Sequence, residues 1–332
     1  MTYAPAPVCE VSGTVPDAPW LNCDNAHLAA LMQFYGAAAP SAPMGMQWHF
    51  ALPTTEQVPV TLRVAVLDAI AAETGIVFDR HRVPIDRYYD TVAASTAAGV
   101  PLIVYGDAFH MPWLPYFGND SSAHPTILAG VVDDGETFHL VEAYTNSTPW
   151  GRVVPGPASV TRQQFQTLVE ALPEPQRGEV IVLRERGSAR PHDPADMLRA
   201  NAEGILRHVE QGGELARYAE WGRAAIGERA AADLFDLGCW EVTRARSCHA
   251  SWLVRLAADR PDLVTEELAR RFATEVDEPW RRVSQFAFVN AQRVARGSRP
   301  AVSAADLIAD RLVAAEVRFA YDLLEHLTGR SS

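Results

Sequence analysis

Apolar and polar residues follow two different patterns along the chain, and the change comes near residue 190. Before it, short apolar runs are separated by Gly, Pro and Asp, which is typical of β-strands joined by turns. The clearest of these runs are at 101–106, 125–132, 138–144 and 179–185. From Asp193 to Leu327, apolar residues instead recur at helical spacing. We therefore expect an N-terminal domain with strands, followed by an all-α helical domain.

Four helices are predicted within the first half, at residues 23–36, 61–74, 86–98 and 161–172. In the first of them Leu28, Leu31 and Met32 follow the i, i+3, i+4 spacing, and Gly36 can end the helix. The helices come mostly before the run of strands rather than alternating with it. This order favours an α+β domain over a doubly wound α/β domain.

The segment 187–194, GSARPHDP, has no apolar periodicity and contains a glycine and two prolines. Such a composition is typical of a linker. We therefore predict a domain over 1–186, this linker over 187–194, and a helical domain over 195–332. The helices of the last part are expected at about 195–210, 214–235, 239–258, 263–274, 278–297 and 303–328.

The net charge of the 332-residue chain is −12, from 29 basic and 41 acidic residues. This balance argues against a protein whose main task is to bind nucleic acid or an anionic membrane. Every basic residue is an arginine, which excludes chemistry that needs a lysine, such as a Schiff base. The N-terminus lacks a signal-peptide pattern, and no run approaches the ~18 apolar residues of a membrane span. We expect a cytoplasmic protein.

Cys23 is the strongest candidate for a nucleophile among four cysteines, the others being Cys9, Cys239 and Cys248. None has CxxC spacing, so neither a disulfide framework nor a metal site is expected. Cys23 lies at the predicted start of a helix, where the helix dipole and unsatisfied N–H groups favour a thiolate. The same N–H groups, with Asn22 as a side-chain donor, can form an oxyanion hole. The alternative is that Cys23 is a packed core residue.

The segment 123–144 predicts a hairpin that carries two further candidates. His124 precedes an apolar strand, a turn follows at 133–135, and the second strand carries Glu142. Such a hairpin can place the carboxylate beside the imidazole and orient it, while the other ring nitrogen faces a thiol. A histidine at a strand end can also be a surface or capping residue. Together with Cys23, however, the two residues form a Cys, His, acid series in chain order.

Three segments carry a family resemblance: NCDNAHLAALMQFYG (22–36), GVPLIVYGDAFHMPW (99–113) and AHPTILAGVVDDGETFHLVEAY (123–144). They resemble the N-terminal domain of the butirosin-biosynthesis acyltransferase family, which has a papain-like Cys/His/Asp fold. The resemblance implies Cys23 as nucleophile, His124 as base and Glu142 as the acid. The helical half is similar to a domain that often follows in that family.

The resemblance also implies the reaction. An acyl group would leave a carrier-protein thioester, form acyl-Cys23, and pass to an amine or hydroxyl acceptor, or close a ring, in antibiotic biosynthesis. The phosphopantetheine arm of an acyl or peptidyl carrier protein would be the co-substrate, and a small molecule the acceptor. No bound metal or cofactor is required.

Candidate residues for the acyl or acceptor pocket lie within the second motif or between the motifs: Trp48, His49, Asp107, Trp113 and Tyr116. Trp48 and His49 are placed where the family has a Gly-aromatic segment. The family usually has Asp at the position of Glu142, so Asp107 is the alternative group for orienting His124. His27, one turn after Cys23, is expected to pack, because a thiol and a base on one helix leave no gap for substrate.

Two other function classes stay open: a cysteine hydrolase, either an editing thioesterase or a peptidase, and a non-catalytic partner-binding module. The charge is divided unevenly, since residues 1–186 carry 9 arginines against 19 acidic residues and 187–332 carry 20 against 22. The double arginines at 270–271 and 281–282 are either solvated helix faces or a docking surface for an acidic carrier protein.

Overall fold

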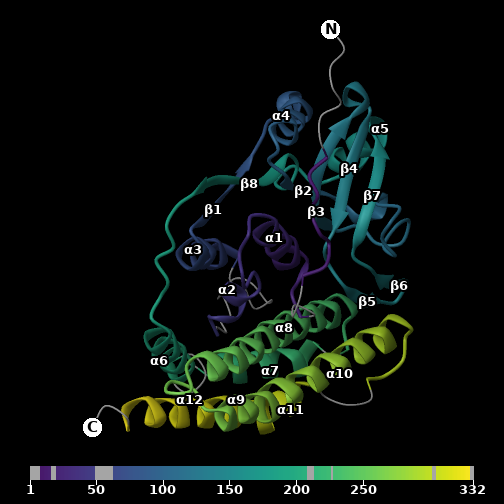
Figure 1. The fold of residues 1–332 in the computed structure, drawn as a ribbon. Helices are drawn as coiled ribbons and strands as arrows, with labels where there is room; N and C mark the ends of the chain where they lie inside the picture. The colour runs from purple at the N-terminus through teal and green to yellow at the C-terminus, as the bar shows by residue number, and fades with distance from the viewer. Residues whose placement is uncertain are drawn as a thin grey trace. The chain divides into compact units, whose positions relative to one another are not determined.

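The computed structural model describes residues 8–15, 20–48, 63–207, 213–225, 227–300 and 304–329. The chain folds into two compact units (Figure 1). The first consists of Met1–Ser41 and Leu67–Arg190, and the second of Ala42–Val66 and Pro191–Ser332. The boundary between the units after Arg190 falls within the predicted linker. The boundaries after Ser41 and Val66 were not predicted, because a continuous domain over 1–186 was expected. The sequence interval 42–66 belongs instead to the helical unit.

The first unit is built on a six-stranded antiparallel sheet with the order β1-β8-β2-β3-β4-β7. Its strands are β1 (Ile76–Arg82), β2 (Leu102–Asp107), β3 (Ala123–Val132), β4 (Thr137–Glu142), β7 (Gly156–Thr161) and β8 (Glu179–Arg186). A separate ribbon pairs β5 (Asn146–Thr148) with β6 (Gly151–Val153). The four predicted apolar runs correspond to β2, β3, β4 and β8. These are the four inner strands of the sheet, so the α+β class is confirmed.

The four helices predicted in the first half of the chain are also present, as α1 (Cys23–Phe34), α3 (Arg63–Thr74), α4 (Ile85–Ala97) and α5 (Arg162–Glu170). Thr161 caps α5 through a reciprocal pair of hydrogen bonds with Gln164. α5 packs against β2, β4 and β7 (Figure 1). Its Phe165 ring stacks on Phe138 of β4 with centroids 4.2 Å apart, both side chains being buried. This stacking fixes one helix on the sheet.

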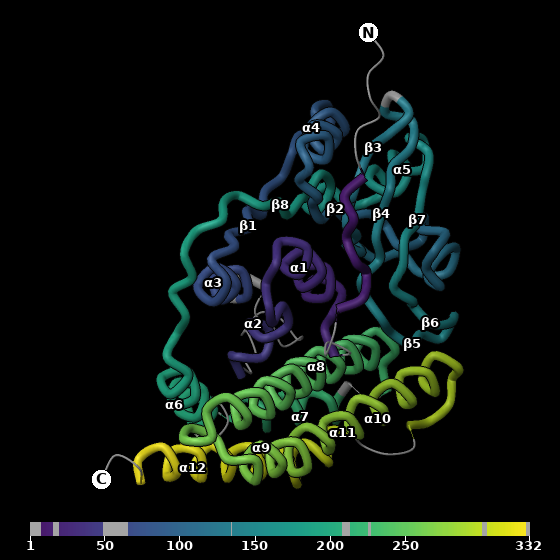
Figure 2. Tube along the Cα trace, viewed as in Figure 1, coloured from purple at the N-terminus to yellow at the C-terminus, as the bar shows by residue number. Residues whose placement is uncertain are grey.

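The second unit consists of helices. They are α2 (Ala42–Gly45), α6 (Pro194–Ile205), α7 (Glu214–Ala225), α8 (Arg229–Asp259), α9 (Glu266–Phe272), α10 (Glu278–Ala295), α11 (Ala304–Leu307) and α12 (Val313–Thr328). Two π-helical turns, η4 (Ala273–Asp277) and η5 (Ile308–Leu312), precede α10 and α12. Figure 2 shows α8 and α10 running side by side. No described helix is long and apolar enough to cross a membrane.

One predicted break between two helices lies at a different position in the structure. The pattern separated 214–235 from 239–258, whereas α8 runs without interruption for 31 residues through Gly238. Glycine inside a helix costs only about 1 kcal/mol relative to alanine, and here Gly238 is buried within the helix packing. The chain instead begins α8 after Glu228, which occupies the N-cap position.

The core of the helical unit contains a charged pair that is fully buried. The Arg246 guanidinium donates two hydrogen bonds of 3.0 Å to the carboxylate of Glu316. Trp280 donates its indole N–H to the same carboxylate at 2.7 Å. The guanidinium also lies 5.2 Å from the ring centre of Trp48. Both charges are therefore satisfied inside an apolar core.

A short segment from the N-terminal half of the sequence packs in this core. The carbonyls of Gly45 and Met46 accept hydrogen bonds of 2.7 Å from His249 Nδ1 and Asn201 Nδ2. The Trp48 N–H donates to Asn201 Oδ1 at 3.1 Å. A Cβ on residue 45 would lie 2.4 Å from the Cys248 carbonyl oxygen, so only glycine fits there. We call residues 45–48 the core strap.

Candidate active site

Cys23 is the first residue of α1 and is partly exposed. Asn22 begins the helix as its N-cap, because its extended backbone lets the side-chain Oδ1 accept the Asn25 N–H at 2.9 Å. The capping bond uses the oxygen of the Asn22 amide, so the prediction that its Nδ2 group donates to an oxyanion stays a prediction. The first turn of α1 still carries the backbone N–H groups that favour negative charge beside the thiol.

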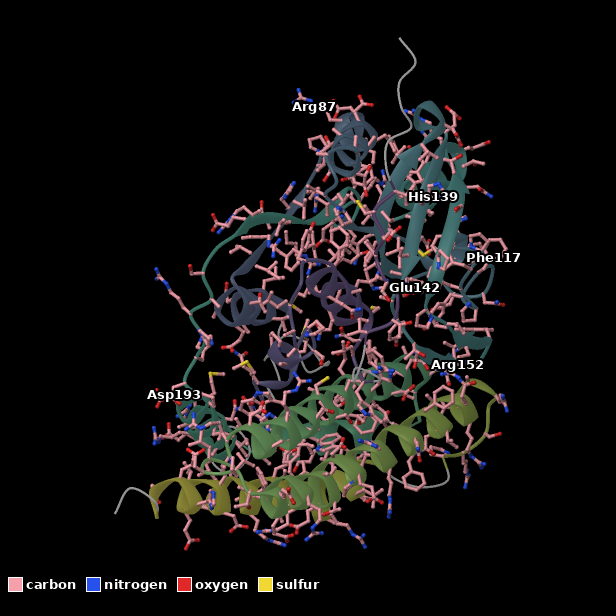
Figure 3. The ribbon with its side chains drawn as sticks, in the orientation of Figure 1. Arg87, Phe117, His139, Glu142, Arg152 and Asp193 are labelled. Carbon is pink, nitrogen blue, oxygen red and sulfur yellow. The ribbon has the colours of Figure 1, made fainter. Side chains whose placement is uncertain are left out.

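The hairpin of β3 and β4 places His124 and Glu142 together. The register pairs Ile127 with Val141, so its continuation places residue 144 opposite His124, and Glu142 lies two residues before that position. The glutamate side chain spans this offset, and His124 Nε2 lies 2.9 Å from Glu142 Oε2. Both side chains are buried, at 5% and 1% exposure. Glu142, labelled in Figure 3, is the last residue of β4.

Asp107, the alternative partner for His124, is engaged elsewhere. Its Oδ1 accepts the Phe109 N–H at 3.0 Å, and its Oδ2 accepts the Ser121 hydroxyl at 2.8 Å. The residue opposite His124 on β2 is Gly106, while Asp107 lies opposite Ala123. The structure thus assigns the contact with the imidazole to Glu142 and gives Asp107 a capping role at the end of its strand.

His27 is buried as expected, and it also makes contacts that were not predicted. Its ring is fully buried, and Nδ1 donates to the Cys23 carbonyl oxygen at 2.6 Å. Its Nε2 lies 3.1 Å from Glu142 Oε1 and 3.2 Å from the Ala143 backbone nitrogen. The i+4 spacing from Cys23 was visible in the sequence. The contact with Glu142 was not, since it depends on how α1 packs on the sheet.

One carboxylate therefore serves two imidazoles. Burial alone would raise the pKa of Glu142, but His124 and His27 together hold it well below its usual value. Burial opposes a charge on His27, yet the Glu142 carboxylate raises the pKa of that imidazole above 6.5. The Glu142 oxygens accept one further bond, from the Tyr144 N–H at 2.8 Å. The network thus holds one buried carboxylate charge in contact with both imidazoles.

These pKa shifts predict a stability maximum in mildly acidic solution. The Glu142 contribution is fully present above its ordinary pKa of 4.5 and is lost as the pH falls through its lowered value. The His27 contribution is fully present below 6.5 and is lost as the pH rises through its raised value. Both act together between pH 4.5 and 6.5. In that range Glu142→Gln is expected to lower the free energy of unfolding by about 3–5 kcal/mol.

Chemical unfolding of the wild type and Glu142→Gln at a series of pH values tests this expectation. Asp107→Asn is the matched control, since it also removes a buried carboxylate but one that bonds Phe109 and Ser121. The difference between wild type and control should show no maximum in this range. A Glu142→Gln difference that does not vary with pH would contradict the assignment.

Within the part of the chain that the structure describes, His27, His124 and Glu142 also form a group of potential metal donors, with donor atoms within 4.8 Å of one another. Each imidazole Nε2 meets a different oxygen of the carboxylate, at 3.1 and 2.9 Å. Those are hydrogen-bond distances, and an ion held by all three groups would have to displace both bonds. The donor set is best described as a carboxylate shared by two imidazoles.

Aromatic rings surround His124. The ring centres of Tyr116 and Tyr144 lie 6.3 and 6.0 Å from the imidazole, and Trp150 lies 6.0 Å from Tyr116. Tyr116 was predicted as a pocket residue, whereas Tyr144 and Trp150 were missed. They follow the second hairpin strand and no spacing rule singled them out. Trp113 makes no ring contact within the described ranges.

Trp48 was expected to line the same pocket, and the structure places it in the helical unit instead. Its side chain is 1% exposed and packs against the rings of His249, Phe272 and Phe319. An indole with these neighbours is a core residue. His49 lies outside the described residues.

Comparison with known proteins gives no assignment: no family model matches this chain, and no curated protein matches it.

Proposed function

We propose that the chain is a cysteine-dependent acyltransferase in which Cys23 is the nucleophile, His124 the general base and Glu142 the residue that orients it. The observation that carries the proposal is the 2.9 Å contact between His124 Nε2 and Glu142. It leaves Nδ1 as the ring nitrogen for proton transfer. A thiol at the start of a helix and an imidazole held by a buried carboxylate are the two halves of a cysteine catalytic centre.

The proposed reaction proceeds in two steps. His124 takes the proton of the Cys23 thiol, and the Cys23 sulfur attacks the thioester carbonyl. The bond from that carbon to the donor sulfur breaks, and the donor leaves as a thiol with the proton returned by His124. An amine or hydroxyl then attacks the acyl-Cys23 carbonyl while His124 removes its proton. The bond to the Cys23 sulfur breaks, and the free enzyme is restored. The backbone N–H groups of the first turn of α1 would stabilise the oxyanion in both steps.

The proposed donor is a thioester on the phosphopantetheine arm of a cytoplasmic carrier protein, and the proposed setting is antibiotic biosynthesis. Support comes from the family resemblance of the three motifs and from the aromatic residues around His124, which suit an acyl chain or a small acceptor. A hydrolase would use water as the acceptor in the second step. A papain-like arrangement of the first unit belongs to the same proposal.

The double arginines at 270–271 and 281–282 were considered as a docking surface for an acidic carrier protein, but they already have acidic partners. All four side chains form ion pairs within the unit, with Glu267, Glu275, Asp277, Glu278 and Asp322. Arg270 and Arg282 are the more exposed, at 60% and 65%. We therefore propose these two as contacts for an acidic carrier, since surface ion pairs exchange readily for other partners.

Intact-mass spectrometry with acyl-loaded carrier proteins tests the proposed function. The expected result is a mass gain equal to the acyl group, located on Cys23 by peptide mapping and lost when an amine acceptor is added. Transfer to the amine supports an acyltransferase, whereas loss of the adduct in buffer alone indicates a hydrolase. An unmodified Cys23 with every thioester offered would overturn the proposal and favour a binding module.

A further inference from the structure

The His27 imidazole joins the helix that carries Cys23 to the strand end that carries Glu142. It donates from Nδ1 to the carbonyl of Cys23 itself, at 2.6 Å, and its Nε2 lies 3.1 Å from Glu142 Oε1. We infer that His27 is a positioning residue that sets the distance between the thiol and the His124–Glu142 pair. The inference rests on the proposed function, in which those three groups react together.

The geometry makes His27 the link between the two halves of the centre. α1 and the β3–β4 hairpin are separate elements of the first unit, and the Cys23 carbonyl belongs to the residue that bears the thiol. Glu142 divides its oxygens, Oε1 toward His27 and Oε2 toward His124. The two rings stand nearly perpendicular, with centres 5.9 Å apart and planes at 88°. A shift of α1 would therefore move the carboxylate that orients His124.

This link does not depend on the protonation state of His27. The charged ring donates to both the Cys23 carbonyl and Glu142. The neutral ring keeps the bond to Cys23 and accepts the Ala143 N–H at Nε2, at 3.2 Å. Ala143 directly follows Glu142, so either state ties the helix to the end of β4. The facing charged groups are Glu142 and Asp24, and both favour the charged ring.

His27 is also poorly placed to act as the base. Its ring is fully buried, and both nitrogens are engaged with the backbone or with Glu142. A ring that releases either bond would give up the contact that holds it. Proton transfer is thus assigned to His124, and His27 acts through geometry alone.

Three substitutions of His27 test its contact with the Cys23 carbonyl and its contact with Glu142 separately. Glutamine extends an amide to the position of Nε2 and can keep the contact with Glu142, whereas asparagine reaches the position of Nδ1 and can keep the bond to the Cys23 carbonyl. Leucine keeps neither. The matched control is His139→Leu, since His139 is on the same strand as Glu142 but bonds Ser159.

We expect His27→Leu to lower kcat by about 10²-fold with little change in KM, because a misplaced thiol slows chemistry rather than binding. His27→Gln and His27→Asn should each recover part of that loss, and the control should remain at the wild-type rate. The alkylation rate of Cys23 by iodoacetamide should follow the same order. Circular dichroism and the unfolding midpoint of each variant establish that the fold is kept.

A His27→Leu protein with wild-type kcat and wild-type Cys23 alkylation would overturn the inference while leaving the proposed function intact. Equal losses in all three variants would also overturn it, since a merely structural role gives no partial recovery. If leucine does not fold, glutamine and asparagine decide alone. If wild-type Cys23 is never acylated, the proposed function fails, and the alkylation series still measures whether His27 positions the thiol.

Discussion

Replacement of Cys23 by alanine is expected to lower kcat for acyl transfer by about 10⁴-fold or more, because no acyl-enzyme can form without the thiol. The expected residual rate is that of donor and acceptor held together without covalent catalysis. The measurement is the release of carrier thiol in the presence of an amine acceptor. Because Cys23 is partly exposed at a helix start, the substitution should leave the unfolding midpoint nearly unchanged.

The other three cysteines provide the matched controls. Burial raises the pKa of Cys9 and Cys239, and it raises the pKa of Cys248 to about 12. These thiols are therefore expected to react with iodoacetamide more slowly than Cys23 near neutral pH. Their alanine variants should keep the wild-type turnover. Equal alkylation of all four thiols, together with an active Cys23→Ala protein, would rule out Cys23 as the nucleophile.

The second large effect is expected in the helical core. Removing one partner of the buried Arg246–Glu316 pair leaves an uncompensated charge, so Arg246→Met is expected to cost about 3–5 kcal/mol of unfolding free energy. The double variant Arg246→Met, Glu316→Leu should recover much of that loss, because an apolar pair of similar volume leaves no charge unpaired. Chemical unfolding followed by tryptophan fluorescence is a direct probe, since Trp280 and Trp48 contact the pair.

Arg260→Met is the control for this experiment. Arg260 pairs with Asp262 in an exposed position, where an ion pair contributes little to folding. Its unfolding midpoint should stay near the wild-type value. If the single core variant behaves like this surface control, the buried pair does not stabilise the helical unit as inferred.

The inner part of the sheet could be read from the sequence, and its edges could not. β2 and β3 have nearly continuous apolar runs because their side chains are buried on both faces of the sheet. β4 and β8 carry shorter apolar runs. β1 is charged toward its end, with Arg80 and Arg82, and β7 begins with glycine and proline. Edge strands bury fewer side chains, so they carry a weaker pattern.

The candidate site was predictable where local geometry sets it. A hairpin pairs its two strands in fixed register, and this is why the contact of His124 with Glu142, at the open end of the hairpin, could be anticipated. The contact of His27 with Glu142 joins residues more than a hundred positions apart. No periodicity encodes such a contact, because it arises from the packing of α1 against the strands. The core position of Trp48 could not be predicted from the sequence either, because it depends on packing against distant residues such as His249.

The core strap also affects the order in which the protein can fold during synthesis. Gly45 and Trp48 leave the ribosome long before His249, Phe272 and Phe319, the residues they contact. Native contacts this distant in sequence form late and slow the folding of the region that needs them. The first unit meanwhile has its last strand, β8, by Arg186. A nascent chain halted near residue 190 would therefore expose an indole that has no core to enter, a surface that a chaperone binds.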